Sequence, residues 1–433
     1  MRILDAPPRV VGLPSAVLIN LNGAVGAGIF ALPALLYAGA GSLAPLALLV
    51  FAAFLIPFVA VGAKLSTLFD QSGGPQLWTH HAFGQVAGFQ AGWLTICGNM
   101  AARAANFHVM VSYLAALFPV FASPLAHTLT VLALIALFTL IAIAGTRKSI
   151  AALWVGTVLK LAPLLALCVV GLFANGLPSE VVMPQFGEFE SVALLMAYAY
   201  SGVGIAAISA GETTEPEKII GRSIYINLAV VALLYAFIQF SYEAIGPDAA
   251  NADSPLAAAG AAVFGEFGIL LISFAAIFSI GTGQLNYFIV MPRILYGMGR
   301  RGSLPKFFGY VAPRLQTPVA AILIYSLIVS GLALSGTFAT LATITVASEL
   351  VVSLALVGAL YKVWRNNDGG IAASMGVGWV AIGLLSVGFV MWLLVQVPPS
   401  AGLSTFGLLV GGMVLYWLAR LRPHEGEDIR IVS

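Results

Sequence analysis

Charged residues are scarce in this sequence of 433 residues: Asp, Glu, Lys and Arg together occupy only 8% of the positions. Hydrophobic residues occupy 60%, which is more apolar surface than a soluble fold can hide. The lack of charge therefore excludes an ordinary soluble protein. It predicts an all-α integral membrane protein whose main partner is the lipid bilayer, and nothing in the sequence suggests nucleic acid as a partner.

Cysteine and histidine are scarce as well. The two cysteines, Cys97 and Cys168, both lie in apolar runs, which argues against a disulfide framework or a metal cluster. The five histidines are scattered and no H-E-x-x-H motif occurs, so a membrane-embedded metalloenzyme would lack its ligands. We expect no enzymatic activity, no metal and no cofactor. The opening MRILDAPPRV does not resemble a cleaved signal peptide, and none is expected.

Long apolar runs, in contrast, recur along the whole chain. A helix needs roughly 20 apolar residues to cross the bilayer, and a turn signal, SGTF, separates two of the runs. We therefore predict twelve transmembrane helices. The predicted spans are residues 12–38, 43–69, 84–118, 125–144, 149–174, 189–211, 220–245, 262–298, 318–335, 338–362, 374–395 and 402–420.

The basic residues are unevenly distributed between the two sets of loops. Lys and Arg collect on the cytoplasmic flanks of membrane helices. If the N-terminus is inside, every basic residue except Arg103 and Lys160 falls on a cytoplasmic loop or an inner helix end. The charged residues of the outer loops are then all acidic. The sequence therefore predicts a protein of the bacterial cytoplasmic membrane with both termini in the cytoplasm.

Glycine is concentrated where a membrane helix tolerates it least. The first span contains LNGAVGAGIFALP, with three glycines within six residues, and the sixth contains AYAYSGVG. Close helix packing is one explanation of such glycines. Helices that are broken at positions 1 and 6 are a second explanation, because they are the signature of a five-plus-five inverted repeat with both breaks near the midplane.

Two facing breaks predict a site for an amino acid. Amide groups at the start of the outer half of the first span favour a carboxylate. Carbonyl groups at the end of the first half of the sixth span, residues 197–199, can accept hydrogen bonds from an ammonium group, and glycine lets the backbone touch the ligand. The predicted substrate-binding residues are Gly26, Ala27, Gly28, Ile29, Ala199, Ser201 and Gly202.

Four segments in order resemble the amino acid–polyamine–organocation superfamily of transporters, and the resemblance covers nearly the whole chain. GAVGAGIFALP is similar to the break in the first helix, and SGGPQLWTHHAFGQVAGFQAGW to the entry into helix 3. AYSGVGIAAISAGETTEPEKIIGRSI is similar to the break in helix 6 and its acidic-Pro turn, and PRILYGMGRRGSLPKFF to the end of helix 8.

The resemblance implies a LeuT-type inverted repeat and an alternating-access carrier of amino acids or related amines. It also implies that Tyr198 covers the substrate from outside, although an ordinary packed aromatic is an equal alternative. The subgroup it suggests is an arginine/agmatine-type antiporter or a basic amino acid or polyamine permease. The implied parts are an N-terminal tail (1–11), two repeats (12–174 and 189–362), helices 11 and 12 (374–420) and a C-terminal tail (421–433).

Lys160 lies deep within the fifth predicted span. It is about eleven residues, roughly 16 Å, from the cytoplasmic end, too deep for its side chain to reach water. The resemblance places it where sodium-coupled relatives of this fold hold a cation. Its ammonium can donate to carbonyls of the first break and to polar groups such as Thr282. Whether Lys160 carries a proton or acts as a permanent cation stays open.

Arg103 and Glu349 are the other charged residues well inside predicted spans. Arg103 cannot be neutralised and needs an anion, a carbonyl cluster or a water-filled cavity. A structural Arg103–Glu349 pair is one interpretation. In the other, Glu349 recognises a cationic amino acid or Arg103 an acidic one.

The mode of transport has several alternatives. We expect a sodium-independent carrier, working as a proton symporter or an exchanger. An exporter and an antiporter of cationic amino acids are alternatives within this class. A channel is the alternative outside it, although a pore would show rings of repeated charge or carbonyl motifs. The particular substrate, the direction of transport and the oligomeric state are not predicted.

Overall fold

The structure is a computed structural model. It describes residues 11–68, 74–144, 150–176, 188–203, 213–246, 253–312, 317–366, 375–376 and 378–421. These parts of the chain are helical, apart from turns and one isolated bridge between Val11 and Thr213. The α-helices are α1 (Leu13–Ala24), α2 (Ala27–Ala40), α3 (Ala44–Ser66), α4 (Pro75–Phe83), α5 (Gln85–Leu117), α6 (Pro124–Ala144), α7 (Ile150–Asn175), α8 (Glu188–Ala199), α9 (Pro216–Ile245), α10 (Pro255–Phe264), α11 (Glu266–Arg300), α12 (Val319–Ser335), α13 (Phe338–Asn366), α14 (Gly378–Val395) and α15 (Pro399–Leu421).

The apolar helices confirm an all-helical integral membrane protein. Within the described residues, eight helical segments are long and apolar enough to cross a membrane. They are Ala27–Ser66, Pro124–Ala144, Gly156–Asn175, Lys218–Ile245, Glu266–Arg300, Phe338–Asn366, Gly378–Val395 and Pro399–Leu421. Two shorter apolar helices, α10 and α12, accompany them.

Helix boundaries follow local sequence signals. Pro216 opens α9 and Gly246, in the left-handed region at φ +61°, ends it. The SGTF turn separates α12 from α13, as predicted. The start of one predicted span was wrong: span 262–298 begins inside α10 (Pro255–Phe264), because Gly265 at φ +63° turns the chain before α11 begins at Glu266. The second half of the predicted span 189–211 and most of both tails lie outside the described residues.

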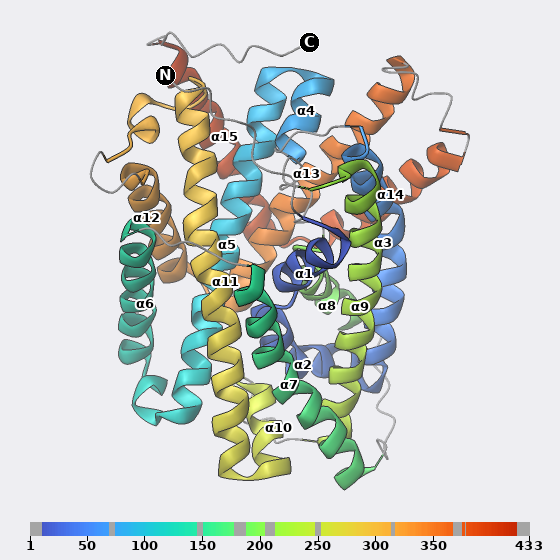
Figure 1. The fold of residues 1–433 in the computed structure, drawn as a ribbon, viewed down its shortest axis with the longest axis vertical. Helices are drawn as coiled ribbons and strands as arrows, with labels where there is room; N and C mark the ends of the chain where they lie inside the picture. The colour runs from blue at the N-terminus through green and yellow to red at the C-terminus, as the bar shows by residue number, and fades with distance from the viewer. Residues whose placement is uncertain are drawn as a thin grey trace.

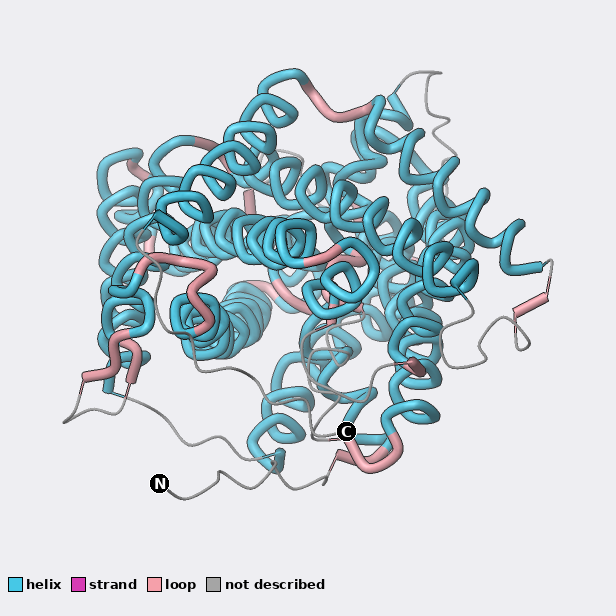
Figure 2. Tube along the Cα trace, turned by 90° about the horizontal axis from the view of Figure 1, so that it is seen from above, coloured by secondary structure: helices cyan, strands magenta, loops and turns pink. Residues whose placement is uncertain are grey.

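The helices surround a centre in which two helices end. In Figure 1, α11 runs nearly the full height of the molecule, with α4 at one end and α10 at the other, whereas α1 and α8 lie near mid-height. Figure 2 shows the helices from above, packed around one another. α5 packs against α13, and α3 against α9. The ends of α1 and α8 are thereby enclosed by longer helices.

Tyr113 ties three helices together in this interior. Its side chain is fully buried, and its hydroxyl donates to the Phe30 carbonyl of α2 at 2.7 Å. The same oxygen accepts the Leu256 amide of α10 at 3.2 Å. That amide belongs to the first turn of its helix, where no intrahelical acceptor exists. One hydroxyl on α5 therefore satisfies polar groups of both α2 and α10.

We expect Tyr113→Phe to lower the free energy of unfolding by about 2 kcal/mol, because it leaves the buried Leu256 amide unpaired and removes the hydrogen bond to the Phe30 carbonyl. Tyr325→Phe is the matched control, since Tyr325 is equally buried but its hydroxyl has no hydrogen-bond partner among the described residues. Thermal unfolding of the detergent-purified variants measures both. Equal midpoints for the two variants would contradict the role of Tyr113.

Candidate substrate site

The first helix is broken at the glycine-rich stretch. α1 ends at Ala24 and α2 begins at Ala27, with Val25 and Gly26 between them. The Val25 amide still bonds the Leu21 carbonyl at 2.8 Å, and the Gly26 amide turns to the Ala24 carbonyl at 2.9 Å. The chain therefore leaves the helix for two residues and re-enters it.

Side chains of other helices satisfy the carbonyl groups at this break. The hydroxyl of Tyr235, on α9, donates to the Ala24 carbonyl at 2.8 Å. The ammonium of Lys160, on α7, donates to the Val25 carbonyl at 3.0 Å, and Lys160 is only 2% exposed. Thr282 instead donates to the Ser279 carbonyl of its own helix, α11, at 3.0 Å. The break is thus closed on its carbonyl side by a phenol and a buried cation.

The amide side of the break has no such cover. Among the residues that the structure describes, no side chain caps the N-terminus of α2, and the first amides of a helix have no intrahelical acceptor. Ala27 and Gly28 line the adjoining cavity, while Ile29 is buried behind it. A Cβ atom added at Gly26 would meet no atom within 4 Å. The glycine leaves open space next to unused amide groups.

The end of α8 meets this break from the other side. α8 ends at Ala199, and the amides of Ser201 and Val203 turn back to the carbonyls of Tyr198 and Tyr200. The carbonyls of Ala197 and Ala199 thus lose the bonds that a continuing helix would give them.

The two breaks are in direct contact. Gly202 has φ +86°, and a Cβ there would come within 2.7 Å of the Gly23 carbonyl oxygen. Only glycine combines this backbone conformation with so close an approach.

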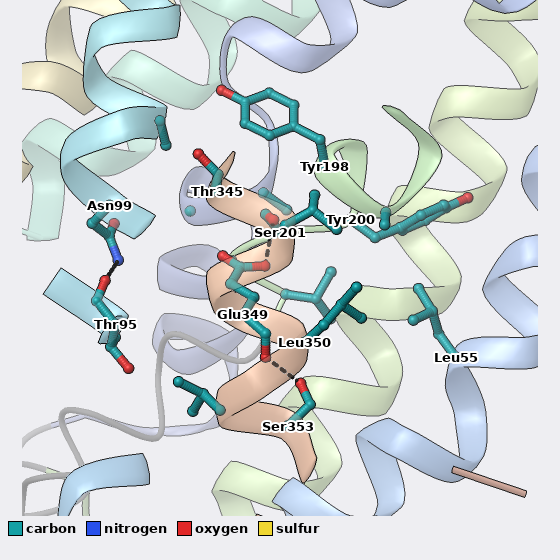
Figure 3. Close-up of a pocket in the computed structure, with 18 of the residues that line it drawn as sticks. Leu55, Thr95, Asn99, Tyr198, Tyr200, Ser201, Thr345, Glu349, Leu350 and Ser353 are labelled. Carbon is teal, nitrogen blue, oxygen red and sulfur yellow. Dashed lines mark hydrogen bonds between the residues drawn. The ribbon is translucent and has the colours of Figure 1, made fainter. Parts of the chain in front are cut away.

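A cavity of about 300 Å³ lies between the breaks. Seen in Figure 3, Glu349 points toward Ser201, with Tyr198 above and Asn99 and Thr95 on the opposite wall. The predicted site residues that line it are Gly26, Ala27, Gly28, Arg103, Tyr198, Ser201, Gly202 and Glu349. The predicted residues Ile29, Ala199, Lys160 and Thr282 are not among its lining residues.

The cavity extends toward the α4 end of the molecule. Pro75 and Trp78 of α4 belong to its lining. At the opposite side stands Tyr198, whose hydroxyl donates to Asn106 Oδ1 at 2.7 Å. Its ring packs edge-on against Phe338, with the centroids 5.5 Å apart. Tyr198 and its two partners therefore separate the cavity from the α10 end.

Arg103 and Glu349 share this cavity, but they do not form the direct ion pair that was one of the two interpretations of the sequence. Neither joins the other in a hydrogen bond or in an N–O contact within 4.0 Å. The Glu349 carboxylate accepts the Ser201 hydroxyl at 2.7 Å instead. The Arg103 guanidinium lies over the Tyr287 ring, with its Cζ 3.9 Å from the centroid. Each charge thus has its own support on the cavity wall.

Sequence reasoning gave no role to Tyr235 or Tyr287. Both stand in long apolar helices, where a tyrosine is ordinary, and neither belongs to a motif. Their functions depend on contacts between α9 and α1 and between α11 and α5. No local pattern reports such contacts.

A family model described as amino acid permease matches residues 11–418. Uncharacterized transporters of Mycobacterium tuberculosis and Mycobacterium bovis are each 28% identical over 346 residues, covering 76% of this chain and 75% of the relative. The serine/threonine exchanger SteT of Bacillus subtilis is 27% identical over 330 residues, covering 72% of this chain and 74% of the relative.

Two glycine substitutions distinguish open space from tight packing at the breaks. We expect Gly26→Val to fill the cavity, abolishing amino acid binding while the thermal midpoint stays within a few degrees of wild type. Gly202→Ala should instead lower the midpoint by several degrees, because its Cβ meets the Gly23 carbonyl in a strained backbone. Thermal unfolding with and without amino acids measures both effects. Normal binding by Gly26→Val would contradict the assignment of the site.

Proposed function

The chain belongs to the amino acid permease family, and from this premise we propose that it carries amino acids across the cytoplasmic membrane by sodium-independent alternating access. The family and the names of its relatives make it a membrane transporter and not an enzyme. Its substrate is accordingly a small-molecule amino acid. The observation that carries the proposal is the uncapped N-terminus of α2 facing a cavity in the middle of the molecule.

The break provides complementary groups for both ends of an amino acid. The amides of Ala27 and Gly28 and the positive end of the α2 dipole suit a carboxylate. The carbonyls of Ala197 and Ala199, which end α8, suit an ammonium group. A cavity of about 300 Å³ accommodates such a ligand. The amino acid thus completes the hydrogen bonds that the two broken helices leave open.

The proposed architecture is twelve transmembrane helices with two inverted repeats, residues 12–174 and 189–362. The meeting of the α1–α2 break with the end of α8 supports it, since inverted repeats place such breaks together. We place both termini and the α4 end in the cytoplasm. Basic residues support this orientation: Lys64, Arg300 and Arg420 each lie in the last turn of a helix that ends near α4 in Figure 1.

In this orientation the structure corresponds to the inward-facing state of the cycle. The cavity reaches the α4 lining, whereas Tyr198, Asn106 and Phe338 close the outer side. A carrier needs a second state in which this closure opens and the α4 side closes. The Tyr198–Asn106 hydrogen bond is the contact that must break.

Lys160 takes the place of a coupling cation in this proposal. Its ammonium is fixed on the Val25 carbonyl of the break, so the position is already occupied by a positive charge. Sodium then has no vacancy to fill. A lysine that releases a proton in the cycle makes the protein a proton symporter, and a permanently charged one makes it an exchanger.

Antiport of cationic amino acids, of the arginine/agmatine type, is the second candidate. Glu349 favours it, because a carboxylate in the cavity attracts a cationic side chain. Arg103 on the same cavity opposes it.

We expect the wild type to take up amino acids into proteoliposomes equally well when choline replaces sodium, and Lys160→Ala to be at least about tenfold slower, because the Val25 carbonyl loses its donor. Lys362→Ala is the control, since Lys362 is exposed at the end of α13. If Lys160 carries the proton, the Ala variant loses pH-dependent uptake but keeps slow exchange. If Lys160 is a permanent cation with a structural role, pH-dependent uptake and exchange decrease together.

Sodium-stimulated uptake by the wild type, or unaltered uptake by Lys160→Ala, would refute this assignment. Counterflow in the same vesicles separates a carrier from a channel. Vesicles that contain a carrier and are preloaded with unlabelled amino acid accumulate labelled amino acid transiently. Vesicles that contain a channel do not.

A further inference from the structure

Arg103 is a buried cation whose guanidinium has no hydrogen-bond acceptor in the described part of the chain. Its side chain is 8% exposed and lines the cavity. Within the described residues, neither its Nε nor the rest of the guanidinium has a hydrogen-bond acceptor. The Tyr287 ring supports the flat face of the group and leaves the N–H groups at its edge unused. A buried donor set of this kind is costly unless a ligand supplies the acceptor.

Glu349 lines the same cavity and can accept hydrogen bonds there, whereas Arg103 can only donate them. One carboxylate oxygen accepts the Ser201 hydroxyl at 2.7 Å. A carboxylate has about four lone-pair sites, so most of its capacity remains for a donor in the cavity. The side chain is partly exposed although it stands in the middle of α13, because it faces this space. The charges of Glu349 and Arg103 interact across the cavity without touching.

A ligand group placed between these two side chains must both accept and donate a hydrogen bond. A cationic group would approach the guanidinium, and an anionic group would approach the carboxylate, each with repulsion in a poorly hydrated space. An apolar group would leave the Arg103 donors unpaired. A hydroxyl or a carboxamide completes the hydrogen bonding of both side chains, because it accepts a hydrogen bond from Arg103 and donates one to Glu349.

We propose that Arg103 and Glu349 form the side-chain subsite of the carrier and select amino acids with an uncharged hydroxyl or carboxamide side chain. The subsite rests on the proposed function, since the cavity must first receive the α-carboxylate and α-ammonium groups. Tyr287 and Ser201 are its positioning residues: the first holds the guanidinium flat, and the second holds the carboxylate apart from it.

Isosteric amino acids test the subsite on the unmodified protein. Threonine and valine have the same shape, as do asparagine, leucine and aspartate, while 2,4-diaminobutyrate supplies a short cation. The half-maximal concentration for raising the thermal midpoint of the purified protein measures affinity. We expect threonine and asparagine to act at concentrations at least tenfold below those of valine, leucine, aspartate and 2,4-diaminobutyrate.

Valine or either charged compound acting as strongly as threonine would overturn the subsite and leave amino acid transport intact. If none of the compounds acts and none enters proteoliposomes, the proposed function itself fails, and the subsite with it. The two failures are therefore distinguishable on the wild type alone.

Matched variants locate the selectivity. We expect Arg103→Gln and Glu349→Gln each to reduce the threonine-to-valine ratio at least fivefold. Arg420→Gln is the control, because Arg420 also lies over a tyrosine, Tyr416 at 4.8 Å, but bonds Gln85 away from the cavity. It should keep the wild-type ratio. An unchanged ratio in both folded site variants would assign the two charges a purely structural role.

Discussion

An unpaired backbone carbonyl in the interior of a membrane protein is the constraint on which this structure depends. Breaking the first helix takes the Ala24 and Val25 carbonyls out of the regular helical pattern, and lipid would offer them no donor. Tyr235 and Lys160 supply the missing hydrogen bonds from α9 and α7. These two contacts allow the chain to leave the helix, and they fix the position of the only buried lysine among the described residues.

The arrangement is asymmetric in a way that leads to function. Protein groups saturate the carbonyl side of the break, whereas the amide side at the start of α2 faces an open cavity. Gly202 packs against the Gly23 carbonyl, so the end of α8 lies directly against the first break. Arg103 and Glu349 are held apart on Tyr287 and Ser201, which keeps both charges available to a ligand instead of to each other.

Much of this organisation could be predicted from the sequence, because the strongest constraints are local. Apolar length predicted helices, and the glycine run placed the break within two residues of where α2 begins at Ala27. The division of α10 from α11 at Gly265 was missed, because the apolar run continues through the turn. The separation of Arg103 from Glu349 could not be predicted either. It depends on Tyr287 and Ser201, which come from α11 and the end of α8.

The central claim is that the free amides of α2 receive the carboxylate of the substrate, and matched ligands with and without that group test it most directly. Alanine, threonine and leucine pair with ethylamine, 1-amino-2-propanol and isoamylamine, which lack only the carboxylate. The account predicts that any amino acid that raises the thermal midpoint of the purified protein loses this effect completely in its amine. An amine that stabilises the protein as well as its parent amino acid would contradict the account.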